Sequence, residues 1–354
     1  MVVIISIDCG CCNKSLPPRS KEHSFVTMRP LTILTILHSF FALTKASDSS
    51  DANPFAVYEA NCPKWDATIE SPPADYPTYR QVPPGMTIPA SWQASYPGSG
   101  ADMTGALISG LTGLGFEYVS DLERLSHVND PGDRTVSVKS HFPRLLTFPP
   151  PDDFHPHRYL DSVILVIHHP MNALPSFHNF EYERDNDIVS HSTRAPLEDW
   201  MLWRDENFVY ELQAWVDHTS YWLDRYSFPW VGGDRFTSIY EGVTDNLEGP
   251  RHVQALAEFI DSMDENIQPA TDPDVVACIW YKFIKAGNVA THRHGSTYRP
   301  LREEHIDAMV EALLGLRARY EKRKDAWEIL PILDQYLDMA EEKRNEEPPA
   351  DELV

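Results

Sequence analysis

The segment SWQASYPGSGADMTGALISGLTG, residues 91–113, constrains the fold of this 354-residue chain more than any other stretch. A strand-like run leads into a turn with Gly98 and Gly100, and apolar residues at helical spacing follow: Leu107, Ile108, Leu111 and Leu114. Glycine lets the backbone turn tightly and approach a ligand closely, and the free N–H groups at a helix start attract an anion. The segment therefore predicts a strand, an anion-holding turn and a helix, with an ordinary turn as the alternative.

The rest of the chain continues this alternation of strands and helices. Strand-like runs occupy residues 134–142, 161–169 and 235–243, and the second, DSVILVIHH, is typical of a buried parallel strand. Helical patterns begin at Pro170 and fill residues 196–226, 249–263, 301–320 and 327–342. We predict an α/β fold with a P-loop-like, mostly parallel sheet and helices on both faces. No Lys follows the glycines, so ATP or GTP hydrolysis and a small-molecule kinase are disfavoured.

The overall charge limits the classes of partner. The chain has 53 acidic and 30 basic residues, a net charge of −23. This charge disfavours nucleic acid, because phosphate backbones bind basic surfaces. An anionic cofactor would need a locally basic site or a site built from backbone N–H groups.

The first part of the chain has the composition of a leader and an arm. Met28 is followed by a basic residue, an apolar run and small residues suited to cleavage after Ala46. This pattern predicts a signal peptide or a short signal-anchor within residues 1–50, with Met28 as the true start. Residues 51–90 are proline-rich and predict an extended arm, residues 91–325 the α/β domain, and residues 326–354 a C-terminal helix and acidic tail. The expected location is the Golgi lumen or the outside of the cell, with membrane contact only through the anchor.

Cysteine and histidine residues leave two questions open. Cys62 and Cys278 either form a disulfide, as a luminal compartment would allow, or remain separate thiols. Three further cysteines lie in the leader: Cys9, Cys11 and Cys12. The paired histidines lack the zinc-binding H-E-x-x-H spacing, so we predict no metal site from them: His155, His157, His168, His169, His292 and His294.

Four segments, in this order and spacing over residues 91–260, resemble the sulfotransferases that use 3′-phosphoadenosine 5′-phosphosulfate (PAPS), most closely the carbohydrate and WSC-domain type. SYPGSG resembles the start of the family's S-[YF]-P-G-S-G-N-T-W loop, and VKSHFP resembles V-K-T-H-[LY]-P. ILVIHHPMNALPSFHNF resembles the strand-to-helix segment that binds the 3′-phosphate. SIYEGVTDNLEGPRHVQALAEFI resembles the late Y-E-x-L strand and its helix.

The resemblance implies sulfuryl transfer from PAPS to a hydroxyl acceptor, such as a carbohydrate. His141 aligns with the catalytic His and is the expected general base, since imidazole titrates near neutral pH. Lys139 would lie near the leaving group, on the same strand face as His141. The expected cofactor-binding residues are Pro97, Gly98, Ser99, Gly100, Ala101, Asp102, Thr104, His168, Ser176, Arg293 and Arg299.

The sequence departs from the family pattern at two of these places. Ala101, Asp102 and Met103 stand where the family has N-T-W, and His168 stands where it has Arg. A mildly acidic compartment would leave His168 partly protonated. An inactive, sulfotransferase-like glycan-binding or scaffold protein is therefore the alternative function. The tryptophans within residues 196–226 either belong to the core or, in the case of Trp203 and Trp222, stack on sugars.

Overall fold

The computed structural model describes residues 58, 62, 88–118, 135–144, 160–188, 193–226, 234–286 and 299–345. The chain divides into two units, Met1–Ala52 and Asn53–Val354, and every described residue belongs to the second unit. The expectations for the leader, for most of the arm and for the last residues of the acidic tail lie outside the described residues. Within the described part, no helix is both long enough and apolar enough to cross a membrane.

The core of the second unit is a five-stranded sheet in the order β2-β3-β1-β4-β5. Its strands are β1 (Ser91–Ser95), β2 (Gly115–Tyr118), β3 (Thr135–Ser140), β4 (Val163–Ile167) and β5 (Arg235–Ile239). All four pairings are parallel, and Gln93 of β1 lies opposite Lys139 of β3 and Ile164 of β4. The predicted α/β fold with a mostly parallel sheet is confirmed.

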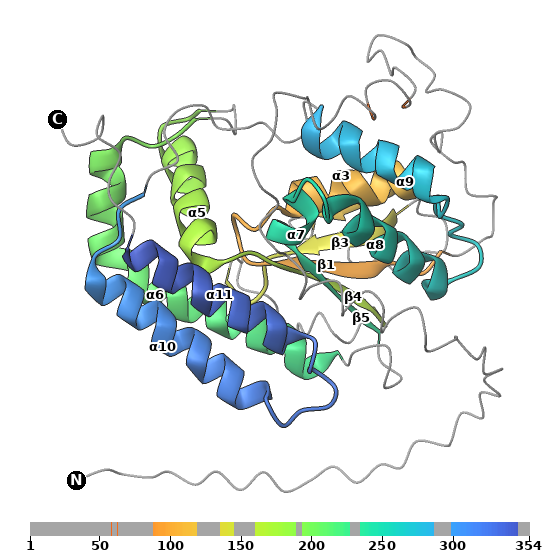
Figure 1. The fold of residues 1–354 in the computed structure, drawn as a ribbon. Helices are drawn as coiled ribbons and strands as arrows, with labels where there is room; N and C mark the ends of the chain where they lie inside the picture. Colours follow the sequence, from red (N-terminus) through yellow and green to blue (C-terminus); the bar gives the residue numbers. More distant parts are fainter. Residues whose placement is uncertain are drawn as a thin grey trace, which may run out of the picture. The chain divides into compact units, whose positions relative to one another are not determined.

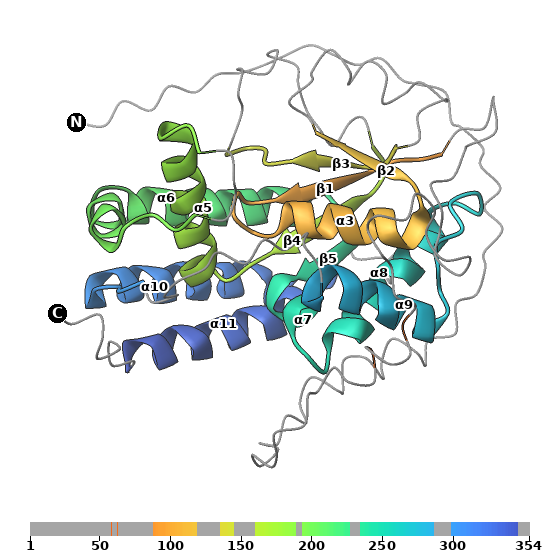
Figure 2. The same cartoon turned by 90° about the horizontal axis from the view of Figure 1, so that it is seen from above.

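Helices cover both faces of this sheet (Figures 1 and 2). One face carries α5 (Pro170–Asp185), α6 (Leu197–Arg225), α10 (Glu303–Tyr320) and α11 (Ile329–Arg344). The other carries α3 (Ala101–Thr112), α8 (Gly249–Met263), α9 (Pro273–Trp280) and the π-helical turn η4 (Tyr281–Lys285). A short helix, α7 (Tyr240–Thr244), follows β5 directly, so the strand expected over residues 235–243 ends at Ile239 and the expectation is wrong for its second half.

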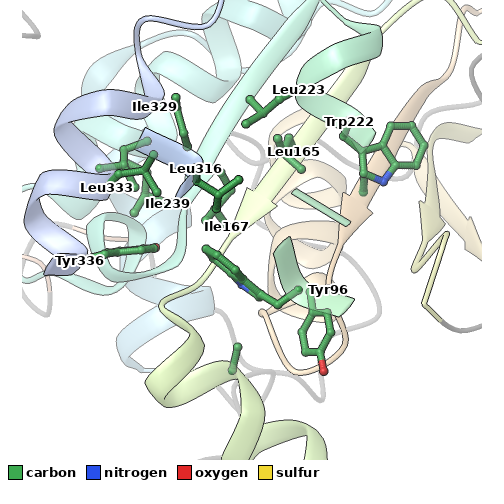
Figure 3. Close-up of a cluster of buried hydrophobic side chains, with 14 of the residues drawn as sticks. Tyr96, Leu165, Ile167, Trp222, Leu223, Ile239, Leu316, Ile329, Leu333 and Tyr336 are labelled. Atoms are coloured by element: carbon green, nitrogen blue, oxygen red, sulfur yellow. The ribbon is translucent and has the colours of Figure 1, made fainter. Parts of the chain in front are cut away.

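Strand β4 shows why its sequence is apolar throughout. Leu165 and Ile167 pack with the α6, α10 and α11 side chains, whereas Ile164 and Val166 pack with α3 and α8. Side chains alternate along a strand, so a strand buried on both faces needs an apolar residue at every position. Figure 3 shows Leu165 and Ile167 among the buried side chains on the α6 side of the sheet, with Leu223 of α6 near Leu165.

Helix α6 supplies most of the aromatic part of that core. Trp200, Trp215 and Trp222 are at most 1% exposed, which confirms the interpretation of the tryptophans as core residues. The suggestion that Trp222 stacks on a sugar is wrong, because its ring is completely covered. Trp203 is half-buried, and its indole Nε1 donates to Glu181 at 2.8 Å.

A disulfide joins Cys62 to Cys278, with their Cα atoms 5.4 Å apart. Tyr58 packs next to it, stacked on Tyr281 at 5.5 Å and edge-on to Trp280 at 5.6 Å between ring centroids. Of the two alternatives for these cysteines, the structure contains the pair. The disulfide fastens the arm to α9 across 216 residues of sequence.

Candidate functional site

Residues from four strands meet at one edge of the sheet, where the parallel strands have their carboxyl ends. β1 leads into the turn that contains Gly98, β3 into His141, β4 into His168, and β5 into Glu241. Open parallel sheets bind their ligands at this edge. The segments of the sequence resemblance therefore meet at one edge of the sheet, although they lie far apart in the sequence.

The glycine turn packs tightly against the protein on two sides. Gly98 and Gly100 have φ angles of +81° and +84°, which side chains other than hydrogen rarely allow. A Cβ atom on Gly98 would lie 2.6 Å from the carbonyl oxygen of Ala173 and 3.1 Å from Cβ of Ser176. A Cβ atom on Gly100 would lie 2.6 Å from the Tyr240 ring. The glycines are therefore needed to seat the turn between α5 and Tyr240, and this contact brings Ser176 next to Gly98.

Helix α3 begins at this turn without a side-chain cap. Gly100 is its N-cap residue, and the Thr104 hydroxyl donates back to the Gly100 carbonyl at 3.1 Å. Ser99 is 1% exposed, and its hydroxyl has no hydrogen-bond partner among the described residues. A buried polar group without a partner is uncommon and often marks a water or ligand position. The helix start and the Ser99 hydroxyl together suit an anionic group.

Asp102 and Lys139 form an ion pair beside the helix start, with Lys139 Nζ 2.8 Å from Asp102 Oδ1. The Lys139 side chain is 11% exposed and the Asp102 side chain 63%. The positive charge expected near the leaving group is thus present, but a carboxylate of the first turn of α3 already neutralises it. Pro97 precedes Gly98 in the turn, and Ala101 is the first residue of α3, with its side chain buried.

His141 is held in one orientation by the strand that precedes the turn. Its Nδ1 donates to the carbonyl oxygen of Ser95 at 2.8 Å and lies 3.3 Å from the Ser95 hydroxyl. A neutral imidazole carries one proton, so Nε2 is left as an acceptor. Burial, together with the Lys139 charge, lowers the pKa of His141 to about 4. At neutral pH the ring is therefore uncharged. The expectation that His141 titrates near neutral pH is wrong, because burial disfavours the protonated ring, and the free protein holds it as a weak base.

His168 and His169 end β4 in different roles. His168 Nδ1 donates to the Gly98 carbonyl at 3.1 Å, and its ring lies 4.0 Å from the Tyr240 ring. His169 caps α5, with Nδ1 accepting from the Met171 N–H at 3.0 Å. Burial lowers the pKa of both rings, which disfavours the partial protonation expected for His168.

Glu241 joins β4, α7 and α11 at this edge. Its Oε1 accepts from the backbone N–H of His169 at 2.9 Å, and its Oε2 accepts from the Tyr336 hydroxyl at 2.8 Å. The same Oε1 lies 3.6 Å from His168 Nε2. The side chain stays 17% exposed. This carboxylate is the Glu of the segment that resembles Y-E-x-L, and it lies beside His168 at the edge of the sheet.

One face of α6 fixes the position of the loops at the edge. Its residues follow helical spacing at 211, 215, 218 and 222. Glu211 accepts from the Tyr96 hydroxyl at 2.7 Å and from Arg144, while Trp215 and Trp222 donate to the carbonyls of residues 168 and 142 at 3.1 and 2.9 Å. His218 lies between them, and burial, with a smaller effect of the neighbouring His141, lowers its pKa to about 3.

The site residues divide into those that meet and those that do not. The structure brings the glycine turn, Lys139, His141, His168 and Ser176 to one edge. Arg299 is buried elsewhere and donates to the Ala195 carbonyl at 3.1 Å. Arg293 lies outside the described residues, as do His155, His157, His292 and His294. Among the described residues, no three side chains of the metal-binding types converge.

Sequence reasoning missed Glu211, His218, Tyr240 and Glu241 as site residues. For Glu211 and His218 the signal is that two polar residues share, at helical spacing, the face of α6 that carries buried tryptophans. Tyr240 and Glu241 directly follow a strand, which is the same signal that singled out His141.

Comparisons with protein-family models, with curated proteins and with solved structures found no match for this chain.

Proposed function

We propose that this protein transfers a sulfuryl group from a nucleotide phosphosulfate to a hydroxyl group of an acceptor, a glycan being the acceptor class that the motifs suggest. PAPS is the donor implied by the sequence resemblance. The observation that carries the proposal is the orientation of His141, whose Nδ1 is fixed by the residue before the glycine turn while its Nε2 stays free to accept. Transfer to a hydroxyl needs a base that takes the proton of the acceptor and hydrogen-bond donors that stabilise the leaving anion. His141 would be the base, and the uncapped start of α3 would supply the donors.

His141 would act as the general base. The acceptor hydroxyl would give its proton to Nε2 as its oxygen bonds to sulfur, and the bond from sulfur to the phosphate oxygen would break. The Ser95 carbonyl then stabilises the protonated ring through Nδ1. General bases of this kind contribute about 100-fold to 10,000-fold in rate.

The helix start, Ser99 and Lys139 would hold the anionic group that accepts the electrons of the breaking bond. Backbone N–H groups and one ammonium group are ordinary partners for such a charge. When bound, the donor supplies a sulfuryl group already attached to a phosphate that can leave. Ser99 fits this role because its hydroxyl is buried without a partner among the described residues.

The disulfide supports the proposed location in the secretory pathway. Disulfides persist in oxidising compartments and are rare in the cytosol. Cys62 and Cys278 are joined across the arm and α9. This agrees with the Golgi lumen or the outside of the cell as the place of the reaction.

The direct test is transfer from radiolabelled PAPS, and separately from radiolabelled adenosine 5′-phosphosulfate, to a panel of polysaccharides. We expect label in at least one polysaccharide, and a loss of at least about 100-fold in His141→Gln. His305→Gln on α10 is the matched control, because His305 packs against Phe208 away from the edge. A folded protein that labels nothing, or a His141→Gln variant as active as wild type, would contradict the proposal.

A second candidate is a catalytically inactive protein that binds glycans. The Asp102–Lys139 ion pair favours it, because it cancels the positive charge beside the helix start. The two candidates separate in the same assay: glycan binding without any transfer, unchanged in His141→Gln, supports the binding protein.

A further inference from the structure

An exposed aromatic ring lies on α6, near the turn that carries His141. Tyr210 is 65% exposed, so most of its ring faces solvent. One side of the ring faces the Arg144 guanidinium, whose central carbon lies 5.6 Å from the ring centroid. An aromatic ring held in this way offers a flat apolar surface with a polar edge, on which the C–H face of a sugar can stack.

Further side chains extend this surface across the place where α5 packs on α6 (Figures 1 and 2). Arg144 also lies over the buried Phe177 ring at 5.5 Å, and Phe177 contacts Trp203 edge-on at 6.3 Å between ring centroids. The half-buried Trp203 donates from Nε1 to Glu181 at 2.8 Å, and the Glu181 side chain is 20% exposed. We call Tyr210, Arg144, Trp203 and Glu181 the Tyr210 surface.

A tight turn joins the Tyr210 surface to His141. The backbone N–H of Arg144 donates to the His141 carbonyl at 2.8 Å, which is the hydrogen bond of a β-turn over residues 141–144. Such a turn brings its first and last Cα atoms within about 7 Å of each other. The Arg144 guanidinium donates to both carboxylate oxygens of Glu211, and a pair of this kind fixes position as well as charge. A chain of a few sugar units bound at Tyr210 is therefore long enough to bring a hydroxyl to His141.

The charges of the Tyr210 surface suit a neutral sugar better than an acidic one. Arg144 is engaged by Glu211, and a Glu181 oxygen lies 3.7 Å from the Arg184 guanidinium. These residues therefore offer no uncompensated positive charge to a carboxylate or a sulfate on a sugar. The chain as a whole carries a net charge of −23, which repels acidic polysaccharides. The carboxylate oxygens of Glu181 are suited to accept hydrogen bonds from sugar hydroxyls.

We propose that the Tyr210 surface is the subsite for a neutral sugar unit of the acceptor glycan, with the sugar ring stacked on Tyr210 and its hydroxyls bonded to Glu181. This inference deepens the proposed function and rests on it, because it takes His141 as the place to which the glycan brings its reacting hydroxyl. Trp203, which the sequence offers as a sugar-stacking residue, belongs to the same surface. Tyr210 then determines which acceptor binds and takes no part in the chemical step.

The experiment measures saccharide affinities of the full chain by isothermal titration calorimetry. The probes are neutral hexasaccharides of glucose, mannose and N-acetylglucosamine, with galacturonate hexasaccharide as the acidic counterpart. The wild type should bind at least one neutral probe, and should bind galacturonate about tenfold more weakly. Tyr210→Ala should weaken binding of the neutral probe by about fivefold to tenfold, whereas Tyr210→Phe keeps the ring and should keep the affinity. Leu247→Ala, which shortens a 71% exposed side chain before α8, is the matched control and should change neither affinity.

The outcomes separate this inference from the proposed function. A wild type that binds galacturonate as tightly as every neutral probe, or that binds no saccharide, would overturn the inference, and so would wild-type affinity in Tyr210→Ala. In the radiolabel assay, Tyr210→Ala should raise the KM for the acceptor and leave kcat and the KM for PAPS near their wild-type values. Transfer that Tyr210→Ala leaves unaffected would contradict the inference alone. Binding that depends on Tyr210, without any transfer, would contradict the proposed function and leave the sugar subsite standing.

Discussion

Asp102 shows how a single residue sets the charge of the site. Its carboxylate lies in the first turn of α3 and pairs with Lys139 at 2.8 Å, although its side chain is 63% exposed. An anion that binds at the helix start must compete with this carboxylate for Lys139. The ion pair is thus a built-in competitor, and weak anion binding by the wild type is the expected consequence.

Replacing Asp102 by Asn should therefore strengthen the binding of nucleotides and of inorganic sulfate. Removing one nearby negative charge should lower the dissociation constant by about threefold to tenfold at low salt, with less effect at high salt. Calorimetric titrations of Asp102→Asn and of the control Asp338→Asn, an exposed position on α11, measure the change. An unchanged affinity in Asp102→Asn would show that anions bind elsewhere.

The starts of helices are predictable from the sequence where a proline marks the first turn. The helices that begin at Pro170 and at Gly249 start where the sequence predicts, because proline suits a first turn. β2 was missed because it is only four residues long, GFEY. α9 and η4 were missed because Pro273–Lys285 is mostly apolar and shows no clear helical period.

The candidate site divides in the same way. Residues that follow strands, such as His141, were predictable from motif order. Partners brought by other elements were not, because contacts such as Tyr336 to Glu241 join residues 95 positions apart. The sequence also left open the pairing of Cys62 with Cys278. The departures at Asp102 and His168 were visible in the sequence, but their partners were not.

Gly98 packs directly against the backbone of α5, so a side chain at this position should destabilise the fold. Gly98→Ala forces a side chain into the α5 backbone at a left-handed φ of +81°, so it should lower the free energy of unfolding by about 2 kcal/mol or more. Gly315→Ala on α10 is the control, because no atom lies within 4 Å of the added methyl group. It should raise stability by about 0.5–1 kcal/mol. Urea unfolding compares the two, and a harmless Gly98→Ala would contradict the packing described here.

On the scale of the whole molecule, buried neutral histidines should make the fold sensitive to acid. Burial lowers the pKa of His169 to about 4 and that of His218 to about 3. These values lie below the unfolded pKa of about 6.5, so the unfolded chain binds protons first as the pH falls. The stability of the folded state is complete above about pH 6.5 and declines below it, by up to about 1.4 kcal/mol per pH unit for each histidine.

Urea unfolding at about pH 7 and about pH 5 measures this loss of stability. The variant His218→Phe keeps an aromatic ring beside Tyr96 and Trp222 and should lose less stability over the same interval. A wild type equally stable at both pH values would show that the buried rings are already charged or are exposed.

The most direct test of the central claim, that His141 and the glycine turn form one site, is nitrogen NMR of the histidine rings. At about neutral pH we predict that His141 carries its proton on Nδ1 and that Nε2 is bare, as its bond to Ser95 requires. Adding adenosine 5′-monophosphate together with sulfate should shift the Nε2 resonance of His141 in step with the calorimetric binding curve. A proton found on Nε2, or a resonance that stays unmoved while the nucleotide saturates the protein, would contradict the claim.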